Sequence, residues 1–145
     1  ELLPQATIVT PNRHEAQKIL GTSKPINDLT AAAAAAREIC LRTGASAALV
    51  KGFKRPNDEE GEAVDFYFDG QEVQEIAADW RPTENTHGSG CVLASAITAG
   101  LALGKPLLEA IQTAKGVVSE AIRQSTDIGA GRAPVNPLAY MAIKK

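Results

Sequence analysis

The length and composition of the chain predict a single domain that carries no strong charge of either sign. Its 145 residues are 44% hydrophobic but only 4% aromatic, so we expect a core built from Ala, Val, Ile and Leu. A formal net charge of −2 and a pI near 5.7 provide no basic field for nucleic acid or a membrane surface. A small metabolite is therefore the expected partner.

The cysteines and the first residues allow expectations about the cellular compartment of the protein and about the extent of its chain. Cys40 and Cys91 provide no disulfide framework, and no Cys-x-x-Cys or paired His spacing indicates structural zinc. A reduced, cytoplasmic protein is expected. No apolar run approaches the length of a membrane span, and Glu1 to Pro4 show neither an initiator Met nor a signal-peptide pattern. The chain is therefore expected to be a piece of a longer one.

The first part of the chain alternates between short β-rich runs and helical segments. Ala6–Thr10 is β-rich and is followed by a proline, which predicts a strand that runs into a turn. Asn12–Leu20 and Ala31–Arg42 are predicted helices; Gly21 can end the first, and six consecutive alanines favour the second. Ser46–Val50 is predicted to form a second, buried strand.

A hairpin and two further helices are predicted for the second part. Lys54–Glu62 is polar and predicts a surface loop. Ala63–Phe68 and Glu72–Ile76 alternate in polarity on either side of Asp69-Gly70, which is a strong hairpin signal. The remaining elements are two helices, at about Cys91–Leu103 and Leu107–Gln124, and a tail, Gly129–Lys145, whose apolar stretch is expected to pack on the core.

The order strand, helices, strand is that of a parallel crossover unit, so the predicted class is α/β with an added antiparallel hairpin. In such a unit the carboxyl ends of the parallel strands meet at the edge of the sheet where ligands bind. Residues 1–145 are expected to form a single domain piece.

The glycine-rich segment that ends at Cys91 is the most informative stretch of the sequence. Gly88 and Gly90 allow backbone amides to converge on one oxyanion, and the helix that follows directs its positive end to the same place. The same residues also fit a flexible loop in which Ser89 is an ordinary N-cap and Cys91 a small buried hydrophobe. A third interpretation is a thiol hydrolase with Cys91 as nucleophile and His87 as base.

Polar side chains follow both predicted parallel strands. Asn12 and Glu15 come after the first, and Lys51-Gly52 comes after the second. Asn12-x-x-Glu15 fits a capping box that needs no ligand, and it equally fits a pair that holds Mg²⁺ through water beside phosphates. Lys51 fits either a solvated strand end or a phosphate ligand.

Lys115 interrupts an apolar stripe on the last predicted helix. A lysine there must extend out to solvent, pair with a carboxylate, or direct its ammonium at a bound anion. Gly116 beside it removes bulk, which suits a close approach. The stripe consists of Leu108, Ile111, Val118 and Ile122.

Together these residues resemble the hydroxymethylpyrimidine and phosphomethylpyrimidine kinases of thiamin biosynthesis. The resemblance covers the whole chain, and its most specific part is the run Asn-Thr-His-Gly-Ser-Gly-Cys, because cysteine in place of aspartate is typical of the pyrimidine and pyridoxal branch. The matching motifs are Leu3-Pro4, Thr10-Pro11-Asn12 with Glu15-Ala16, Val50-Lys51-Gly52, Asn85 to Cys91, Ala114-Lys115 and Gly129-Ala130-Gly131.

The resemblance implies the C-terminal, nucleotide-binding and catalytic half of a ribokinase-like three-layer α/β/α fold. It implies transfer of phosphoryl groups from ATP, with Mg²⁺, to 4-amino-5-hydroxymethyl-2-methylpyrimidine and then to its monophosphate. It also allows a homodimer of the intact protein, and it assigns three kinds of site residue. These are catalytic residues (Cys91 as base, with Gly88, Ser89 and Gly90), nucleotide-binding residues (Lys51, Gly52, Thr86, His87 and Lys115), and Asn12 and Glu15, which organise Mg²⁺ through water.

Two departures from the family pattern qualify these expectations. Many members have a second Gly and a His after Lys51-Gly52, where this chain has Phe53-Lys54. The chain also begins where the C-terminal half of the family begins, so residues 1–145 alone are expected to bind nucleotide weakly and to turn over no pyrimidine. Two other functions stay open: a pyridoxal kinase of the same branch, and a non-catalytic nucleotide-binding module.

Overall fold

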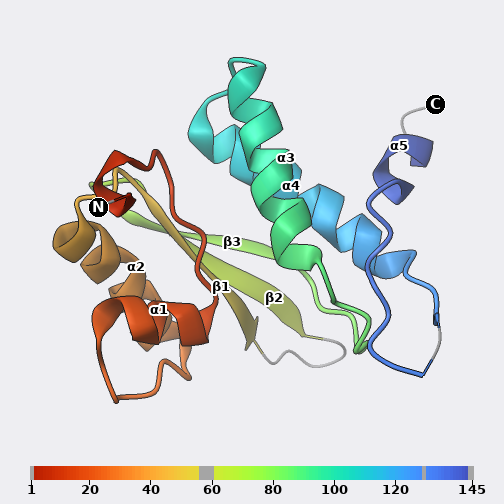
Figure 1. Ribbon diagram of the computed structural model, residues 1–145, viewed down its shortest axis with the longest axis horizontal. Helices are drawn as coiled ribbons and strands as arrows, with labels where there is room; N and C mark the ends of the chain where they lie inside the picture. The colour runs from red at the N-terminus through yellow and green to blue at the C-terminus, as the bar shows by residue number, and fades with distance from the viewer. Residues whose placement is uncertain (1, 56–60, 129, 144–145) are drawn as a thin grey trace. The chain divides into compact units, whose positions relative to one another are not determined.

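Helices and a three-stranded sheet make up the first part of the chain, and helices make up most of the rest (Figure 1). The structure is a computed structural model that describes residues 2–55, 61–128 and 130–143. Internal contacts divide the chain into two compact units, Glu1–Ala77 and Ala78–Lys145. The elements are η1 (Leu3–Gln5), α1 (Arg13–Leu20), α2 (Leu29–Thr43), β1 (Ala48–Arg55), β2 (Glu62–Phe68), β3 (Val73–Asp79), α3 (Ser89–Ala102), α4 (Leu107–Arg123) and α5 (Ala139–Ile143).

The predicted hairpin is present in the first unit. The sheet has the order β1-β2-β3, and β1 pairs with β2 in antiparallel register, with Ala48 opposite Phe68. The β2–β3 connection is closed by Asp69, whose Oδ1 accepts the backbone N–H groups of Gln71 at 2.8 Å and Glu72 at 2.9 Å. A short Asx-type turn therefore fixes the hairpin, as the Asp-Gly pair predicts.

The segment before α1 lies parallel to β1, as the crossover pattern predicts. The Val9 N–H donates to the Ala47 carbonyl at 3.1 Å, and the Leu49 N–H donates to the Val9 carbonyl at 2.8 Å. Only single bridges form here, at Val9 and at Asn12, rather than the predicted continuous strand. Pro11 explains the difference, because it has no N–H to continue the ladder although its carbonyl accepts from Lys51 N–H at 3.0 Å.

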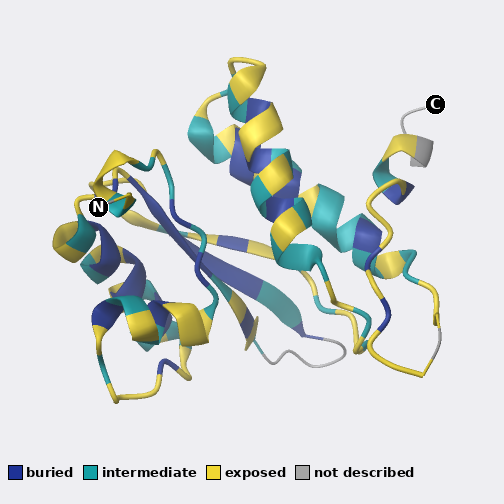
Figure 2. Cartoon of the chain, viewed as in Figure 1, coloured by how far each residue is buried: buried dark blue, intermediate teal, exposed yellow. Residues whose placement is uncertain are grey.

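Two capped helices cover one face of this sheet. Asp28 caps α2 by accepting the Ala31 N–H at 2.7 Å, so the helix starts two residues before the predicted Ala31. Small alanine side chains on α2 let it lie close to the strands, where β1 and β2 are the most continuously buried elements (Figure 2). The shared core includes Ala32, Ala35, Ala36, Ile39, Val50, Val64, Phe66 and Phe68.

β1 is longer than predicted, and this corrects two expectations. It continues through Lys51 and Gly52 to Arg55, so these two residues lie inside the strand and do not follow it. The pairing with β2 extends the strand, since Arg55 lies opposite Glu62, and the Arg55 guanidinium also pairs with Glu62 on β2 at 2.9 Å and with Glu75 on β3. The ends of the predicted loop Lys54–Glu62 are therefore strand residues, and positions 56–60 lie outside the described residues.

The chain departs from the family pattern at Phe53-Lys54, and Phe53 is part of the hydrophobic core. Phe53 is buried and meets Phe66 in an edge-to-face contact, with ring centroids 6.1 Å apart. Lys54 is exposed on the opposite side of the strand. An aromatic residue at position 53 thus contributes packing of β1 on β2.

The second unit is built on the pair α3 and α4, which have close to their predicted bounds. Gly100 on α3 allows the close contact, because a Cβ there would lie 2.9 Å from the Cβ of Ala110 on α4. The tail packs on this unit as expected: Ala133 and Val135 are buried, and the Asn136 N–H donates to the Ala121 carbonyl at 2.9 Å. Of the late glycine motif, position 129 lies outside the described residues.

Candidate functional site

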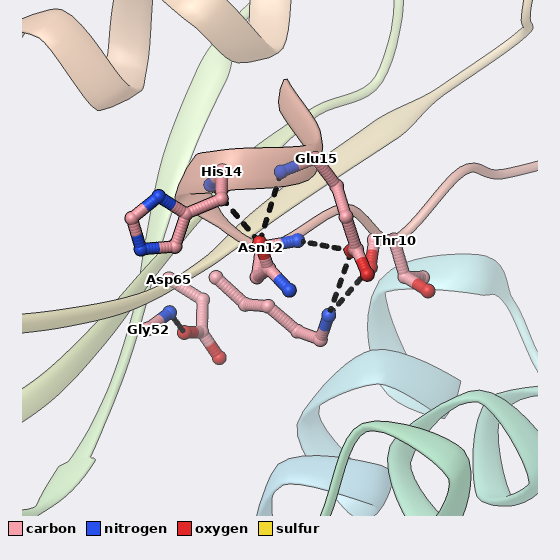
Figure 3. Close-up of polar contacts among 7 residues, drawn as sticks. Thr10, Asn12, His14, Glu15, Gly52 and Asp65 are labelled. Atoms are coloured by element: carbon pink, nitrogen blue, oxygen red, sulfur yellow. Dashed lines mark hydrogen bonds and ion pairs between the residues drawn. The ribbon is translucent and has the colours of Figure 1, made fainter. Parts of the chain in front are cut away.

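Asn12 and Glu15 form a complete capping box at the start of α1 (Figure 3). Asn12 Oδ1 accepts the N–H groups of His14 at 2.9 Å and Glu15 at 3.0 Å, and Glu15 Oε2 accepts the Asn12 N–H at 2.8 Å. The structural interpretation of Asn12-x-x-Glu15 is therefore confirmed. It leaves a ligand-binding role open, because the Glu15 side chain is 56% exposed.

Lys51 reaches this capping box from β1. Its Nζ donates to the Thr10 carbonyl at 2.7 Å and lies 3.9 Å from Glu15 Oε2. The Lys51 side chain is only 17% exposed, so it is not the freely solvated strand-end lysine that one interpretation of the sequence allowed. The structure thus brings Asn12, Glu15 and Lys51 together, as the placement of both segments at one sheet edge predicts.

A β-bulge shapes the strand at Lys51 and Gly52. Val50 pairs with Phe66 and Phe53 pairs with Val64, so two residues of β1 stand opposite the single residue Asp65 of β2. Gly52 has φ +93°, a left-handed conformation that favours glycine. Its N–H donates to Asp65 Oδ1 at 2.9 Å (Figure 3).

The sequence interpretation overlooked Asp65. The sequence does contain a signal for Asp65, namely a carboxylate within an apolar and aromatic run. Such a carboxylate is unusual in a strand that is buried on both faces, as this one is around Val64, Phe66, Tyr67 and Phe68. Asp65 is only 5% exposed.

The exposed side of the capping box borders a groove of about 430 Å³. Its polar lining includes the side chains of Glu15 and Lys18, and the remaining lining residues are Val9, Thr10, Pro11 and Ile19. Within the described ranges, no cluster of three or more His, Cys, Asp or Glu residues would hold a metal ion directly.

The glycine segment of the second unit opens α3. Gly88 is the N-cap, with φ +83°, and Ser89 is the first helical residue. The alternative in which Ser89 is the N-cap is therefore wrong by one position, because the left-handed Gly88 starts the helix earlier. Gly90 lies within the first turn, so of these two glycines only Gly88 has a positive φ and bends the chain sharply.

The first turn of α3 presents N–H groups and an exposed thiol. The Ser89 N–H donates to the Thr86 carbonyl at 3.1 Å, and the first helical hydrogen bond runs from the Val92 N–H to the Gly88 carbonyl at 3.0 Å. The N–H groups of Gly90 and Cys91 lie between these two and have no acceptor within the helix. The Cys91 thiol is exposed, which contradicts its interpretation as a buried hydrophobe.

Cys40, the other cysteine of the chain, differs from Cys91 in its burial. Cys40 is buried on α2, and burial raises the pKa of its thiol, which makes it less reactive. Cys91 is therefore the accessible thiol of the described chain.

Hydrogen bonds with Asp127, Ala133 and Val135 hold the start of the glycine segment in place. Asn85 Nδ2 donates to Asp127 Oδ1 at 2.7 Å, and Asn85 Oδ1 accepts the Ala133 N–H at 3.3 Å. The His87 carbonyl accepts the Val135 N–H at 3.0 Å. Asn85 and the backbone of His87 thus tie the start of the segment to residues 42 to 48 positions later. The side chains of Thr86 and His87 are exposed.

Lys115 is buried on α4 beside Ala114, with 8% exposure. Its place in the apolar stripe is therefore as predicted. Gly116 is exposed, and a Cβ there would meet nothing within 4 Å, so packing within the described chain does not require this glycine.

Solved structures identify the class of protein that has this fold. The chain is 31% identical to a Bacillus subtilis pyridoxal kinase solved with ADP, with a TM-score of 0.87 over 97% of this chain and 51% of that one. It is 37% identical to a Staphylococcus aureus pyridoxal kinase solved with AMP-PCP, with a TM-score of 0.85 over 96% and 50% of the two chains. These are kinases of the ribokinase-like class, so the predicted fold is confirmed.

Sequence comparison identifies the family within that class. A family model described as phosphomethylpyrimidine kinase matches residues 1–136, and the chain belongs to this family. Hydroxymethylpyrimidine/phosphomethylpyrimidine kinases of Rhizobium meliloti and Synechococcus elongatus are 44% and 43% identical to it. The matches cover 94% and 92% of this chain, which spans about half the length of these relatives. The resemblance found in the sequence is thereby confirmed.

None of the described helices is long and apolar enough to cross a membrane.

Proposed function

We propose that the protein containing this chain is an ATP-dependent kinase of 4-amino-5-hydroxymethyl-2-methylpyrimidine and of its monophosphate, in thiamin biosynthesis. The observation that supports this most directly is the first turn of α3, where the exposed Cys91 lies beside N–H groups that the helix leaves without acceptors. Membership of the phosphomethylpyrimidine kinase family and the names of the relatives support the same substrate.

In this proposal the glycine segment binds the phosphoryl group while it is transferred from ATP to the substrate. The substrate hydroxyl oxygen attacks the γ-phosphorus of ATP, the bond to the β-phosphate oxygen breaks, and Cys91 accepts the hydroxyl proton. The segment from Gly88 to Cys91 holds the oxygens of the transferring group, chiefly through the Gly90 and Cys91 amides, which have no acceptor within the helix. A helix N-terminus is complementary in charge to such a group. Lys51, Gly52, Thr86, His87 and Lys115 are proposed as nucleotide-binding residues.

We propose that Asn12 and Glu15 hold Mg²⁺ through water molecules. The residues fit such an ion, because carboxylate and amide oxygens suit Mg²⁺, which keeps much of its hydration in proteins. Glu15 is exposed beside the groove, although both side chains also accept the hydrogen bonds of the capping box. When bound, the ion would neutralise phosphate charge. Glu15 would orient the water ligands of the ion.

A pyridoxal kinase activity is the second candidate, because solved pyridoxal kinases share the fold of this chain over nearly its whole length. Competition between the pyrimidine and pyridoxal for phosphorylation by the complete protein distinguishes the two. A kcat/KM that favours pyridoxal would overturn the pyrimidine assignment.

The catalytic proposal is tested by replacing Cys91 with Ala in the complete protein. Loss of a general base should lower kcat about 10²- to 10⁴-fold while the Kd for ATP stays unchanged. Ser95→Ala, an exposed position one turn later on the same helix, is the matched control and should keep the normal rate. An unchanged kcat in Cys91→Ala would remove the assigned role of the thiol.

A further inference from the structure

A buried carboxylate stands opposite the bulge that carries Lys51. Asp65 is 5% exposed, and its strand neighbours Val64 and Phe66 are also buried. Burial of a carboxylate is costly unless hydrogen bonds compensate, so a carboxylate at this position needs a reason. One of its contacts is the hydrogen bond from the Gly52 N–H, at 2.9 Å.

The bulge creates the need for this acceptor. Two residues of β1 face one residue of β2 here, so the regular ladder of hydrogen bonds is interrupted. The Lys51 N–H is satisfied on the other edge of β1 by the Pro11 carbonyl, at 3.0 Å. Gly52, which has φ +93° and no register partner on β2, donates its N–H to Asp65 Oδ1.

The same bulge sets the direction of the Lys51 side chain. Side chains alternate between the faces of a regular strand, and one extra residue changes which face each residue presents. At this bulge the Lys51 ammonium reaches the Thr10 carbonyl and lies 3.9 Å from the Glu15 carboxylate. Asp65 and Lys51 are therefore linked through Gly52.

We propose that Asp65 is a positioning residue for Lys51. By holding the Gly52 N–H it fixes the bulge, and the bulge keeps the Lys51 ammonium at the carbonyl of Thr10 and beside Glu15. The further consequence, that Asp65 supports nucleotide binding through Lys51, rests on the function proposed above.

The position of Lys51 is tested directly by chemical labelling, with no need for activity. Acetylation of each lysine of the complete protein by limiting acetic anhydride is followed by mass spectrometry of peptides. Asp65→Ala should raise the labelling rate of Lys51 about three- to tenfold, because the bulge opens locally, whereas the exposed Lys18 should not change. Asp65→Asn keeps a side-chain oxygen that can accept the Gly52 N–H, so it should restore much of the protection.

Two further variants keep the test decisive if Asp65→Ala folds poorly. Gly52→Ala places a side chain at φ +93° with nothing within 4 Å to clash, so it strains only the bulge and should raise Lys51 labelling in the same way. Glu72→Gln alters an exposed carboxylate next to the same hairpin and should leave Lys51 labelling unchanged. Unchanged Lys51 labelling in both Asp65→Ala and Gly52→Ala, or an equal rise at Lys18, would overturn the proposal.

Kinetics of the complete protein then separate this proposal from the proposed function. Asp65→Ala and Lys51→Met should each raise the KM for ATP about tenfold with a smaller change in kcat, and the double variant should be no worse than Lys51→Met alone. A normal KM in Lys51→Met would contradict the nucleotide role of Lys51 and leave the labelling result standing. A double variant in which the two effects multiply would contradict the positioning role of Asp65.

Discussion

Asn85 donates a hydrogen bond to Asp127 at 2.7 Å, across 42 positions of sequence. Its side-chain oxygen also accepts the Ala133 N–H, so one amide joins the segment before the glycine turn to Asp127 and to the tail. The turn that starts α3 is therefore held by residues from a distant part of the sequence as well as shaped by Gly88.

Replacement of Asn85 by Ala should loosen this turn. Loss of the two hydrogen bonds to Asp127 and Ala133 should cost about 1–2 kcal/mol of stability and lower kcat about tenfold, because the amides of the turn are no longer held in place. Hydrogen exchange of residues 84–91 and kcat of the complete protein measure the two effects. Asp127→Asn keeps an acceptor for Asn85 and is the control. Normal hydrogen exchange in Asn85→Ala would show that Asn85 does not hold the turn in place.

Glu15 allows the structural and the metal-binding role of the capping box to be separated. Glu15→Gln keeps an oxygen that accepts the Asn12 N–H, so the free energy of unfolding should change by less than about 0.5 kcal/mol. The Mg²⁺ concentration for half-maximal activity should rise about tenfold, because the charge that orients the water ligands is lost.

Asn12→Ala provides the converse test. It removes the acceptor of the His14 and Glu15 N–H groups and should cost about 1 kcal/mol in chemical denaturation. If Glu15→Gln were to lose stability as well and show the usual Mg²⁺ dependence, Glu15 would be a capping residue and nothing more.

Local signals explain which parts of this structure could be predicted. The capping box at Asn12, the end of α1 at Gly21 and the hairpin turn at Asp69 each depend on side chains within a few residues of the backbone that they bond. The parallel pairing beside β1 followed from element order alone. The motif from Asn85 to Cys91 was specific enough to identify the family.

Contacts between distant segments explain what could not be predicted. The bulge at Lys51 and Gly52 depends on the register of β2, so the end of the strand was placed too early. The role of Asn85 depends on a tail that returns to it from Asp127. α3 starts two residues before its predicted position because Gly88 adopts the left-handed conformation, which the sequence permits for either glycine.

Gly100 and Gly116 lie on paired helices and should respond to alanine in opposite ways. A Cβ at Gly100 would lie 2.9 Å from Ala110 Cβ and 3.3 Å from its Cα, so α3 and α4 would have to separate. Gly100→Ala should therefore destabilise the protein by about 1–3 kcal/mol. A Cβ at Gly116 meets nothing within 4 Å in a helix interior, and Gly116→Ala should stabilise by about 0.5–1 kcal/mol.

Urea denaturation of the two variants measures both values. Gly116→Ala also tests the expectation that a ligand approaches closely beside Lys115, since weaker ATP binding in a more stable variant would indicate such an approach. A Gly100→Ala variant as stable as the parent would show that the α3–α4 contact can adjust.

Asp69 should contribute to the pH dependence of stability on the acid side. The N–H groups of Glu72 and Gln71 hold the pKa of its carboxyl below the ordinary value, because they bind the charged form. A group whose pKa is lower in the folded state stabilises the fold above its unfolded pKa, and this contribution is lost as the pH falls through the folded pKa. Asp69→Asn has no carboxyl to titrate, so the stability difference between parent and variant should shrink as the pH falls below about 4. Urea denaturation from pH 7 to pH 3 tests this; a difference that is constant over that range would show that the turn does not distinguish the charged from the neutral carboxyl.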